Sequence, residues 1–237
     1  MKLVIGNQKS YLNKDTINNF VNNINEFERN NVILCPSDIF LTEFNKTNIL
    51  LGSQNISIYD NGAFTGEISV EQIKSLGVNF SIVGHSERRE LFGETIEDTN
   101  IKIKKLLDNK IIPILCIGES KEEKENGQTK EVILKELLGA FKNVDNNLIE
   151  KVIIAYEPIW SIGTGIIPTN EEIENISKYI RDFIRENYNS YCILLYGGSV
   201  NLKNIDELNK IEVVDGYLIG GASTKVDDFI EIIKKCS

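Results

Sequence analysis

The stretch Val152-Ile-Ile-Ala-Tyr-Glu-Pro-Ile-Trp-Ser-Ile-Gly-Thr-Gly165 joins a short apolar run, one carboxylate and a glycine-containing loop. Val152–Tyr156 has the composition of a buried strand, and a proline ends the run directly after Glu157. Gly163 and Gly165 supply the backbone freedom of a hinge. The stretch therefore predicts a base on a rigid strand end with a lid behind it. A strand that ends in a surface Glu-Pro pair is the simpler alternative.

Seven further apolar runs resemble this one, which makes eight predicted strands. Each has about four to six residues and is rich in Ile, Val and Leu, as in strands buried on both faces of a parallel sheet. The eight are Leu3–Gly6, Val32–Cys35, Ile49–Gly52, Phe80–Gly84, Ile112–Ile117, Val152–Tyr156, Cys192–Tyr196 and Gly216–Ile219.

Amphipathic stretches with helical spacing lie between the runs. Thr169 with Glu172, and Ser69 with Gln72, form capping boxes that predict two helix starts. The first of these helices is predicted to bury Ile173, Ile176, Ile180, Phe183 and Ile184, and the last helix of the chain Val226, Phe229, Ile230 and Ile233. The charged stretch Lys121–Gln128, which contains Asn-Gly, is predicted to be an exposed turn or frayed helix.

Eight strands that alternate with helices predict an α/β fold, a (β/α)8 barrel, formed by one domain over residues 1–237. An open doubly wound sheet fits less well, because the count is eight and no dinucleotide-binding glycine motif occurs. We see no linker and no change of composition that would mark a domain boundary.

The composition is that of an ordinary globular protein, with 41% apolar and 26% charged residues. A net charge of −9 argues against a nucleic-acid partner. No apolar stretch is long enough to span a bilayer, and the chain opens with a strand in place of a signal peptide. The four cysteines, Cys35, Cys116, Cys192 and Cys236, show no metal-ligand spacing. We therefore expect a cytoplasmic protein with reduced thiols and no membrane partner.

Polar and glycine residues follow five of the predicted strands. Because active sites of such barrels form at the carboxyl ends of the strands, these residues are predicted to converge. They are Asn7, Gln8 and Lys9 after the first strand, His85 to Arg89 after the fourth, Glu157 after the sixth, Gly197, Gly198 and Ser199 after the seventh, and Gly220 and Gly221 after the eighth.

His85 is the only histidine and stands at a predicted helix start, which disfavours the imidazolium form. A carboxylate base and a neutral imidazole in one cavity indicate proton transfer next to a carbonyl. Lys9 would supply positive charge for an anionic substrate. Taken singly, a packed histidine, a solvated lysine and glycines in tight turns are the alternatives. Two glycine pairs after strands seven and eight favour a phosphate site built from backbone N–H groups.

Seven motifs occur along the chain in an order that resembles the triose-phosphate isomerase family, over nearly the whole chain. They are Asn7-Gln-Lys9, Gly62-Ala-Phe-Thr-Gly-Glu-Ile-Ser69, Gly84-His-Ser-Glu-Arg-Arg89, Cys116-Ile-Gly-Glu119, Ala155 to Gly165, Tyr196-Gly-Gly-Ser-Val200 and Asp215-Gly to Gly220-Gly-Ala222. The resemblance implies an isomerase that interconverts dihydroxyacetone phosphate and D-glyceraldehyde 3-phosphate through an enediol(ate), in glycolysis and gluconeogenesis.

The resemblance also implies roles for single residues. Glu157 would be the base and His85 the neutral electrophile, with Asn7 and Lys9 assisting and Glu87 holding Lys9. The substrate would be bound by Asn7, Lys9, Gly163, Ser199, Gly220 and Gly221. No metal or organic cofactor is implied. The loop from Gln54 to Ser69, with Thr65 and Glu67, would insert into a partner subunit, so a homodimer is expected.

Two departures from the family pattern affect these expectations. Gln8 replaces a common Trp and Ser10 a common Met, which predicts altered packing around a retained site. Ile166-Ile167-Pro168 replaces Lys-x-Ala at the far end of the lid. In the family, the hydroxyl of the tyrosine that matches Tyr196 is expected to bond the backbone N–H at the position of Pro168 when the lid closes. Proline has no N–H, so this chain cannot form that bond. Tyr196→Phe is therefore expected to change kcat/KM by less than about threefold. Closure of the lid would instead depend on a contact between Ser199 and the backbone near Gly165, and on the substrate phosphate.

Two other functions compete with the isomerase reading. A phosphate-binding pseudoenzyme or adhesion protein on this fold is disfavoured because Glu157, His85 and Lys9 are all present. A barrel isomerase for a larger phosphosugar or anthranilate derivative would need more room than the short loops after strands seven and eight leave.

Overall fold

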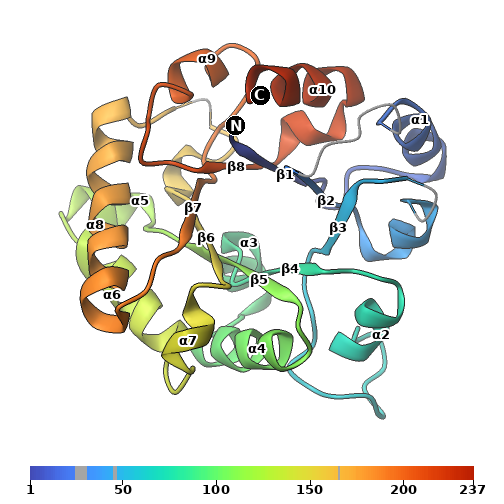
Figure 1. Cartoon of the computed structure of the whole chain (residues 1–237), viewed down its shortest axis with the longest axis horizontal. Coiled ribbons are helices and arrows are strands. Elements are labelled where there is room, and N and C mark those ends of the chain that lie inside the picture. The colour runs from blue at the N-terminus through green and yellow to red at the C-terminus, as the bar shows by residue number, and fades with distance from the viewer. Residues whose placement is uncertain (25–30, 45–46, 165) are drawn as a thin grey trace.

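A computed structural model describes residues 1–24, 31–44, 47–164 and 166–237. Eight parallel strands form a closed barrel in sequence order, and β8 pairs with β1 (Figure 1). The strands are β1 (Leu3–Asn7), β2 (Val32–Cys35), β3 (Leu50–Ser53), β4 (Phe80–Val83), β5 (Ile112–Ile117), β6 (Ile153–Tyr156), β7 (Ile193–Tyr196) and β8 (Gly216–Ile219). The predicted barrel is confirmed.

Helices surround the barrel and connect successive strands (Figure 1). The α-helices are α1 (Lys14–Ile24), α2 (Val70–Ser75), α3 (Ser86–Phe92), α4 (Ile96–Asp108), α5 (Lys121–Glu125), α6 (Thr129–Ala140), α7 (Asn146–Ile149), α8 (Asn170–Tyr188), α9 (Ile205–Leu208) and α10 (Val226–Lys235). Short 3-10 helices are η1 (Asp38–Phe44), η2 (Ile159–Ser161) and η3 (Gly221–Thr224). No helix in the described ranges has both the length and the apolar character needed to cross a bilayer.

The predicted helix starts at Ser69 and Thr169 are confirmed, since both residues form capping boxes with Gln72 and Glu172. The stretch Lys121–Gln128, predicted to be an exposed turn or frayed helix, has no buried residue and contains both a short helix, α5, and a turn at Asn126-Gly127. Ser120 caps α5 through Glu123, so this exposed stretch begins as an ordered helix and turns only after it. Some strand ends move by one residue; Gly84, for example, leaves β4 because its φ is +68°.

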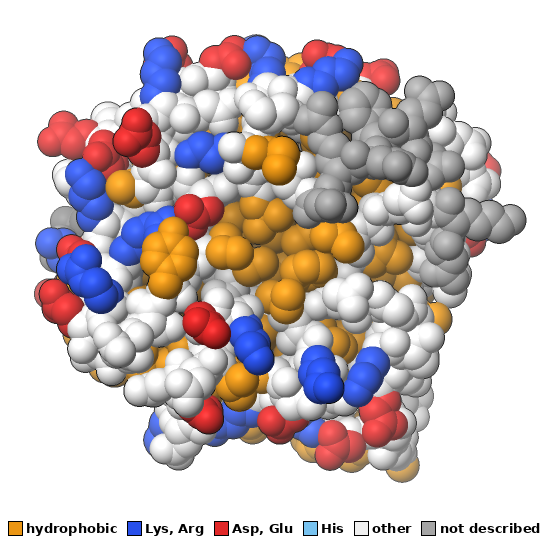
Figure 2. Space-filling model, viewed as in Figure 1, with side chains coloured by type: hydrophobic (Ala, Val, Ile, Leu, Met, Phe, Trp, Pro, Cys, Tyr) orange, Lys and Arg blue, Asp and Glu red, His pale blue; other side chains and the backbone are white. Residues whose placement is uncertain are grey.

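Two layers of apolar side chains form the core. One fills the barrel interior, where Ile5, Ile33, Ile82, Ile114 and Leu218 are buried together. The other lies between the strands and the helices. All four cysteines are buried and none forms a disulfide. Figure 2 shows charged side chains around the rim of one face and hydrophobic side chains gathered near its middle, over the barrel.

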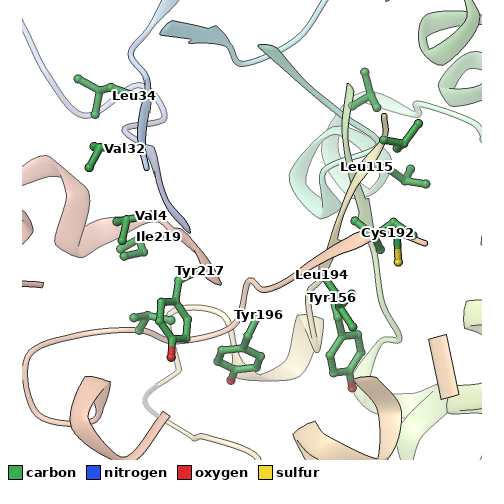
Figure 3. Close-up of a cluster of buried hydrophobic side chains, with 14 of the residues drawn as sticks. Val4, Val32, Leu34, Leu115, Tyr156, Cys192, Leu194, Tyr196, Tyr217 and Ile219 are labelled. Atoms are coloured by element: carbon green, nitrogen blue, oxygen red, sulfur yellow. The ribbon is translucent and has the colours of Figure 1, made fainter. Parts of the chain in front are cut away.

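Three tyrosines form a row on the helix-facing side of the barrel. The register pairs Tyr156 of β6 with Tyr196 of β7, and Tyr196 with Tyr217 of β8. Figure 3 shows their hydroxyl groups pointing to the same side. The Tyr156 hydroxyl lies 3.2 Å from both carboxylate oxygens of Glu119, and the Tyr217 hydroxyl donates to the Asn209 side chain at 2.9 Å. The middle hydroxyl has no such partner among the described residues.

Candidate active site

The carboxyl ends of β1, β4, β6, β7 and β8 surround a pocket of about 240 Å³. Ten residues that the sequence singled out line it, namely Asn7, Lys9, His85, Glu157, Gly163, Gly197, Gly198, Ser199, Gly220 and Gly221. Glu87 lines a neighbouring groove together with Lys9 and His85. Of the two residues predicted for the dimer loop, Glu67 borders that groove, and Thr65 is exposed and borders neither space. The predicted convergence at one end of the barrel is present.

Glu157 follows β6 with its side chain almost completely buried. Its backbone N–H donates to the carbonyl of Ile117 at 2.7 Å, which continues the pairing with β5. Two glycines let neighbouring segments of the same chain approach Glu157. A Cβ on Gly118 would lie 1.8 Å from the Glu157 carbonyl oxygen, and a Cβ on Gly197 would lie 2.8 Å from the Glu157 Cγ. Larger residues at these positions would displace the carboxylate.

The two carboxylate oxygens of Glu157 have different surroundings. Oε1 lies 3.3 Å from Nε2 of His85, whereas Oε2 has no hydrogen-bond partner among the described residues. Burial of a charged oxygen without a partner is costly, because water no longer solvates it. One oxygen is therefore available to accept a proton from a molecule in the pocket.

His85 caps the start of α3, as the sequence predicted. Its Nδ1 accepts a hydrogen bond from the backbone N–H of Glu87 at 3.2 Å. A ring nitrogen that accepts carries no proton, so in this arrangement the imidazole is neutral and has its proton on Nε2. That N–H faces the pocket and Glu157.

Lys9 is the one cationic side chain among the described residues that line the pocket. Its Nζ lies 2.6 Å from Oε1 of Glu87, 78 residues away in the chain. Its backbone has φ +50°, which is unusual for lysine, and is held on both sides. The Lys9 N–H donates to Oδ1 of Asn7 at 3.1 Å, and the side-chain amide of Gln54 donates to the Lys9 carbonyl at 2.8 Å.

Glycines and Ser199 line another part of the pocket. Gly163 has φ +71°, a conformation that favours glycine. A Cβ on Gly220 would lie 3.3 Å from Cε of Lys9, so the lysine stem passes close to this backbone. Gly221 begins η3 with no atom within 4 Å of where its Cβ would be. Gly165, the second predicted hinge glycine, lies outside the described residues.

The expected departures from the family pattern have clear structural counterparts. Gln8 is buried, and its Nε2 donates to the Ser223 carbonyl at 3.2 Å, which joins the end of β1 to η3. The Tyr196 hydroxyl has no hydrogen-bond partner among the described residues.

Sequence reasoning missed the contacts that hold the start of the loop after β6. The Trp160 indole N–H donates to Oε1 of Glu119 at 2.8 Å, and Nζ of Lys124 lies 3.4 Å from the Trp160 ring centroid. Burial raises the pKa of Glu119, and the bonds from Trp160 and Tyr156 offset part of that rise. The sequence carries a signal for these contacts: Glu119 ends the motif Cys116-Ile-Gly-Glu119, and Ser120 marks the start of a capped helix that carries Lys124.

Ser161 was missed as well. It is a small polar residue within the apolar sequence Ile159-Trp-Ser-Ile162 and is completely buried. A hydroxyl in such a stretch normally has a polar partner, and that expectation could have singled it out.

A parallel barrel with a buried carboxylate, a neutral imidazole and one lysine around a small pocket defines an enzyme that moves protons within an anionic substrate. The family model of triosephosphate isomerase matches residues 2–236. A triosephosphate isomerase of Alkaliphilus oremlandii is 43% identical over 227 residues, which cover 92% of this chain and 91% of that protein. The chain belongs to the triosephosphate isomerase family.

Two more relatives, both triosephosphate isomerases, match almost end to end. The one from Mycoplasmopsis pulmonis is 42% identical, with 98% of this chain and 96% of that protein covered. The one from Francisella philomiragia is 37% identical, with 100% of this chain and 97% of that protein covered. The reaction is therefore the interconversion of dihydroxyacetone phosphate and D-glyceraldehyde 3-phosphate, a step of glycolysis.

Proposed function

We propose that Glu157 is the base that carries a proton between the two reacting carbons of the triose phosphate, and that residues 1–237 act as one catalytic domain. The observation that carries this proposal is the buried carboxylate with an unpartnered Oε2. An oxygen without a partner, in a carboxylate that lines the pocket, is placed to accept a proton from a bound molecule. Removal of a proton next to the carbonyl gives the enediolate, and return of the proton to the other carbon completes the isomerisation.

His85 polarises the substrate carbonyl in this proposal. Its Nε2 carries the ring proton, because Nδ1 accepts from the N–H of Glu87. A neutral donor next to the developing oxyanion stabilises the enediolate. The same donor can then pass its proton to the substrate oxygen. The 3.3 Å between Nε2 and Oε1 of Glu157 brings acid and base to the same small molecule.

Lys9 supplies the positive charge that the net charge of −9 does not. Glu87 orients its ammonium group, and Asn7 holds its backbone through Oδ1. A fixed cation stabilises both the substrate phosphate and the enediolate without reorganisation during the reaction. Backbone N–H groups of Gly163, Ser199, Gly220 and Gly221 bind the phosphate in this proposal, assisted by the Ser199 hydroxyl.

The experiment is an isomerase assay on the purified protein with D-glyceraldehyde 3-phosphate, for wild type and His85→Ala. We expect the wild type to be active and the variant to lose on the order of 10²-fold or more in kcat, as loss of a positioned acid–base group does. An inactive, folded wild type would refute the function. Near wild-type turnover of the variant would remove His85 from the mechanism.

The proposal includes a homodimer. A groove of about 370 Å³ beside the pocket is lined by Lys9, His85 and Glu87 and also by Gly66, Glu67 and Ile68. Tyr59 and Phe64 stack at a centroid distance of 4.2 Å with both rings partly exposed. Exposed apolar groups near a groove are typical of a surface that a partner covers.

In the dimer that we propose, the loop Gln54–Ser69 of each copy enters the groove of the other copy, with Thr65 closest to the partner's pocket. Leu91 and Phe92 on α3, with 72% and 67% of their surface exposed, become part of the covered surface. A glycolytic role and four buried thiols support a cytoplasmic location.

A further inference from the structure

Two buried hydroxyls near the pocket lack hydrogen-bond partners among the described residues: the Tyr196 phenol and the Ser161 Oγ. Tyr196 is 1% exposed and Ser161 is fully buried. Buried hydroxyls are normally satisfied, because burial without a partner forfeits the hydrogen bonds that water would make. The neighbouring tyrosines of the same row follow this rule, since Tyr156 contacts Glu119 and Tyr217 contacts Asn209 (Figure 3).

The two hydroxyls meet at Gly198. A Cβ on this glycine would lie 2.3 Å from the Tyr196 hydroxyl oxygen and 2.6 Å from the Ser161 Oγ. Both oxygens therefore converge on the space that a glycine leaves open. Each hydroxyl can donate or accept by rotation about its C–O bond, so the pair can satisfy both groups at once.

The surroundings of the Tyr196 hydroxyl also affect its pKa. Burial raises its pKa to about 12, and the neighbouring Ser161 hydroxyl offsets part of that rise. A hydroxyl that donates to the phenol oxygen has this effect on the pKa of a tyrosine.

We propose that Ser161 and Tyr196 form a hydrogen bond that fixes the start of the loop after β6 to the end of β7, which makes Ser161 a positioning residue of the active site. The inference rests on the proposed function. Ser161 directly precedes Ile162 and Gly163, which line the pocket, and it follows Glu157 by four residues. Because Pro168 has no N–H, the far end of the loop cannot supply a backbone donor at that position. The near end holds the loop instead.

The test is a double-mutant cycle of Ser161→Ala and Tyr196→Phe, which remove one oxygen each and create little space. For dihydroxyacetone phosphate we expect each single variant to raise KM about threefold to tenfold, with kcat changed less than about twofold. For Tyr196→Phe this replaces the change of less than about threefold that the sequence predicts from Pro168 alone, because the sequence does not show Ser161 as a partner of the phenol. The double variant should lose no more than the worse single variant, because both changes remove the same bond. Unchanged KM in Tyr196→Phe, or losses that multiply in the double variant, would overturn the proposal.

Trp160, the only tryptophan, gives a second readout that does not depend on catalysis. It stands next to Ser161, and its indole is held by Glu119 and Lys124. We expect acrylamide to quench its fluorescence about twofold more efficiently in either single variant and no more in the double variant. Equal quenching in all four proteins would contradict the anchoring role.

Tyr217→Phe is the matched control. It removes a buried hydroxyl from the same row, but that hydroxyl contacts Asn209 and not the loop. We expect a lower melting temperature with unchanged KM and unchanged Trp160 quenching. Effects on KM equal to those of Tyr196→Phe would mean that any hydroxyl loss in the row perturbs the pocket, and would overturn the proposal. An inactive wild type with intact coupling in the quenching cycle would refute the proposed function and leave the hydrogen bond standing.

Discussion

Single residues of the pocket occupy states that are unfavourable in isolation. Lys9 has a left-handed backbone, and Oε2 of Glu157 is buried without a hydrogen-bond partner among the described residues. The surrounding fold supports both: Asn7 and Gln54 hold the Lys9 backbone, and two glycines admit the neighbouring strands to Glu157. Strain of this kind concentrates at functional sites, because the required geometry is not the one that the isolated residue prefers.

The buried carboxyl group of the single residue Asp38 is expected to make the stability of the protein depend on pH. Burial raises its pKa to about 6, and a backbone hydrogen bond from Gln54 lowers it in part. Its ordinary value is near 3.8, so the folded state binds this proton more tightly. The stabilising contribution is fully present below about pH 4 and is lost as the pH rises through about 6.

We expect Asp38→Asn to remove this contribution. Between pH 4 and 8 the free energy of unfolding of the wild type should fall by about 1–3 kcal/mol relative to the variant. Urea unfolding of both proteins across that range measures the difference. A difference that stays constant with pH would show that Asp38 titrates normally.

At the scale of elements, capped helix starts fix the loops that border the pocket. Thr169 Oγ1 accepts from the Glu172 N–H at 3.2 Å, and the Glu172 carboxylate accepts from the Thr169 N–H at 2.8 Å. Glu172 also pairs with Lys124, which covers the Trp160 ring. The start of α8 is thereby connected to the loop that carries Ser161.

Thr169→Ala should lower the free energy of unfolding by about 0.5–2 kcal/mol, because it leaves an N–H of the first turn without its acceptor. Thr169→Ser is the control, since it keeps the hydroxyl and should stay close to wild type. Urea unfolding at fixed pH compares the three proteins. An alanine variant as stable as wild type would mean that the cap contributes nothing in this context.

Most elements could be predicted because their signals are local. A run such as Ile112–Ile117 is apolar throughout, and Thr169 with Glu172 marks a helix start whatever lies around it. Local signals were less clear in the stretch after Ser120, where a capping box with Glu123 is followed by charges and Asn-Gly. The proximity of the Ser161 and Tyr196 hydroxyls could not be predicted from the sequence, because it depends on the space that Gly198 leaves open.

For the whole molecule, the closed parallel barrel brings distant polar residues to one end. Lys9 and Glu87 meet across 78 residues of chain because β1 and β4 end at the same face. The count of strands predicts this convergence, and the resemblance supplied the pairing. The left-handed backbone of Lys9 could not be predicted, since nothing in the residue type favours it.

Dimerisation is tested by static light scattering at micromolar concentration, where we expect a mass of two chains. Phe64→Asp should shift the equilibrium towards the monomer and reduce activity, because it places a charge on a surface that we propose is covered. Leu138→Asp is the control: Leu138 is 49% exposed on α6, and its replacement should leave the dimer intact. A monomeric wild type, or equal effects of the two variants, would contradict the proposed interface.

The most direct test of the proposed mechanism is the conversion of D-glyceraldehyde 3-phosphate in D2O, followed by proton NMR, for wild type, Glu157→Gln and Glu186→Gln. Glu186 is an exposed glutamate on α8 and controls for the chemical change itself. We predict that wild type and Glu186→Gln form dihydroxyacetone phosphate with deuterium on the reacting carbon, and that Glu157→Gln does so on the order of 10²-fold more slowly or worse. Undiminished conversion by Glu157→Gln would contradict the assignment of Glu157 as the base.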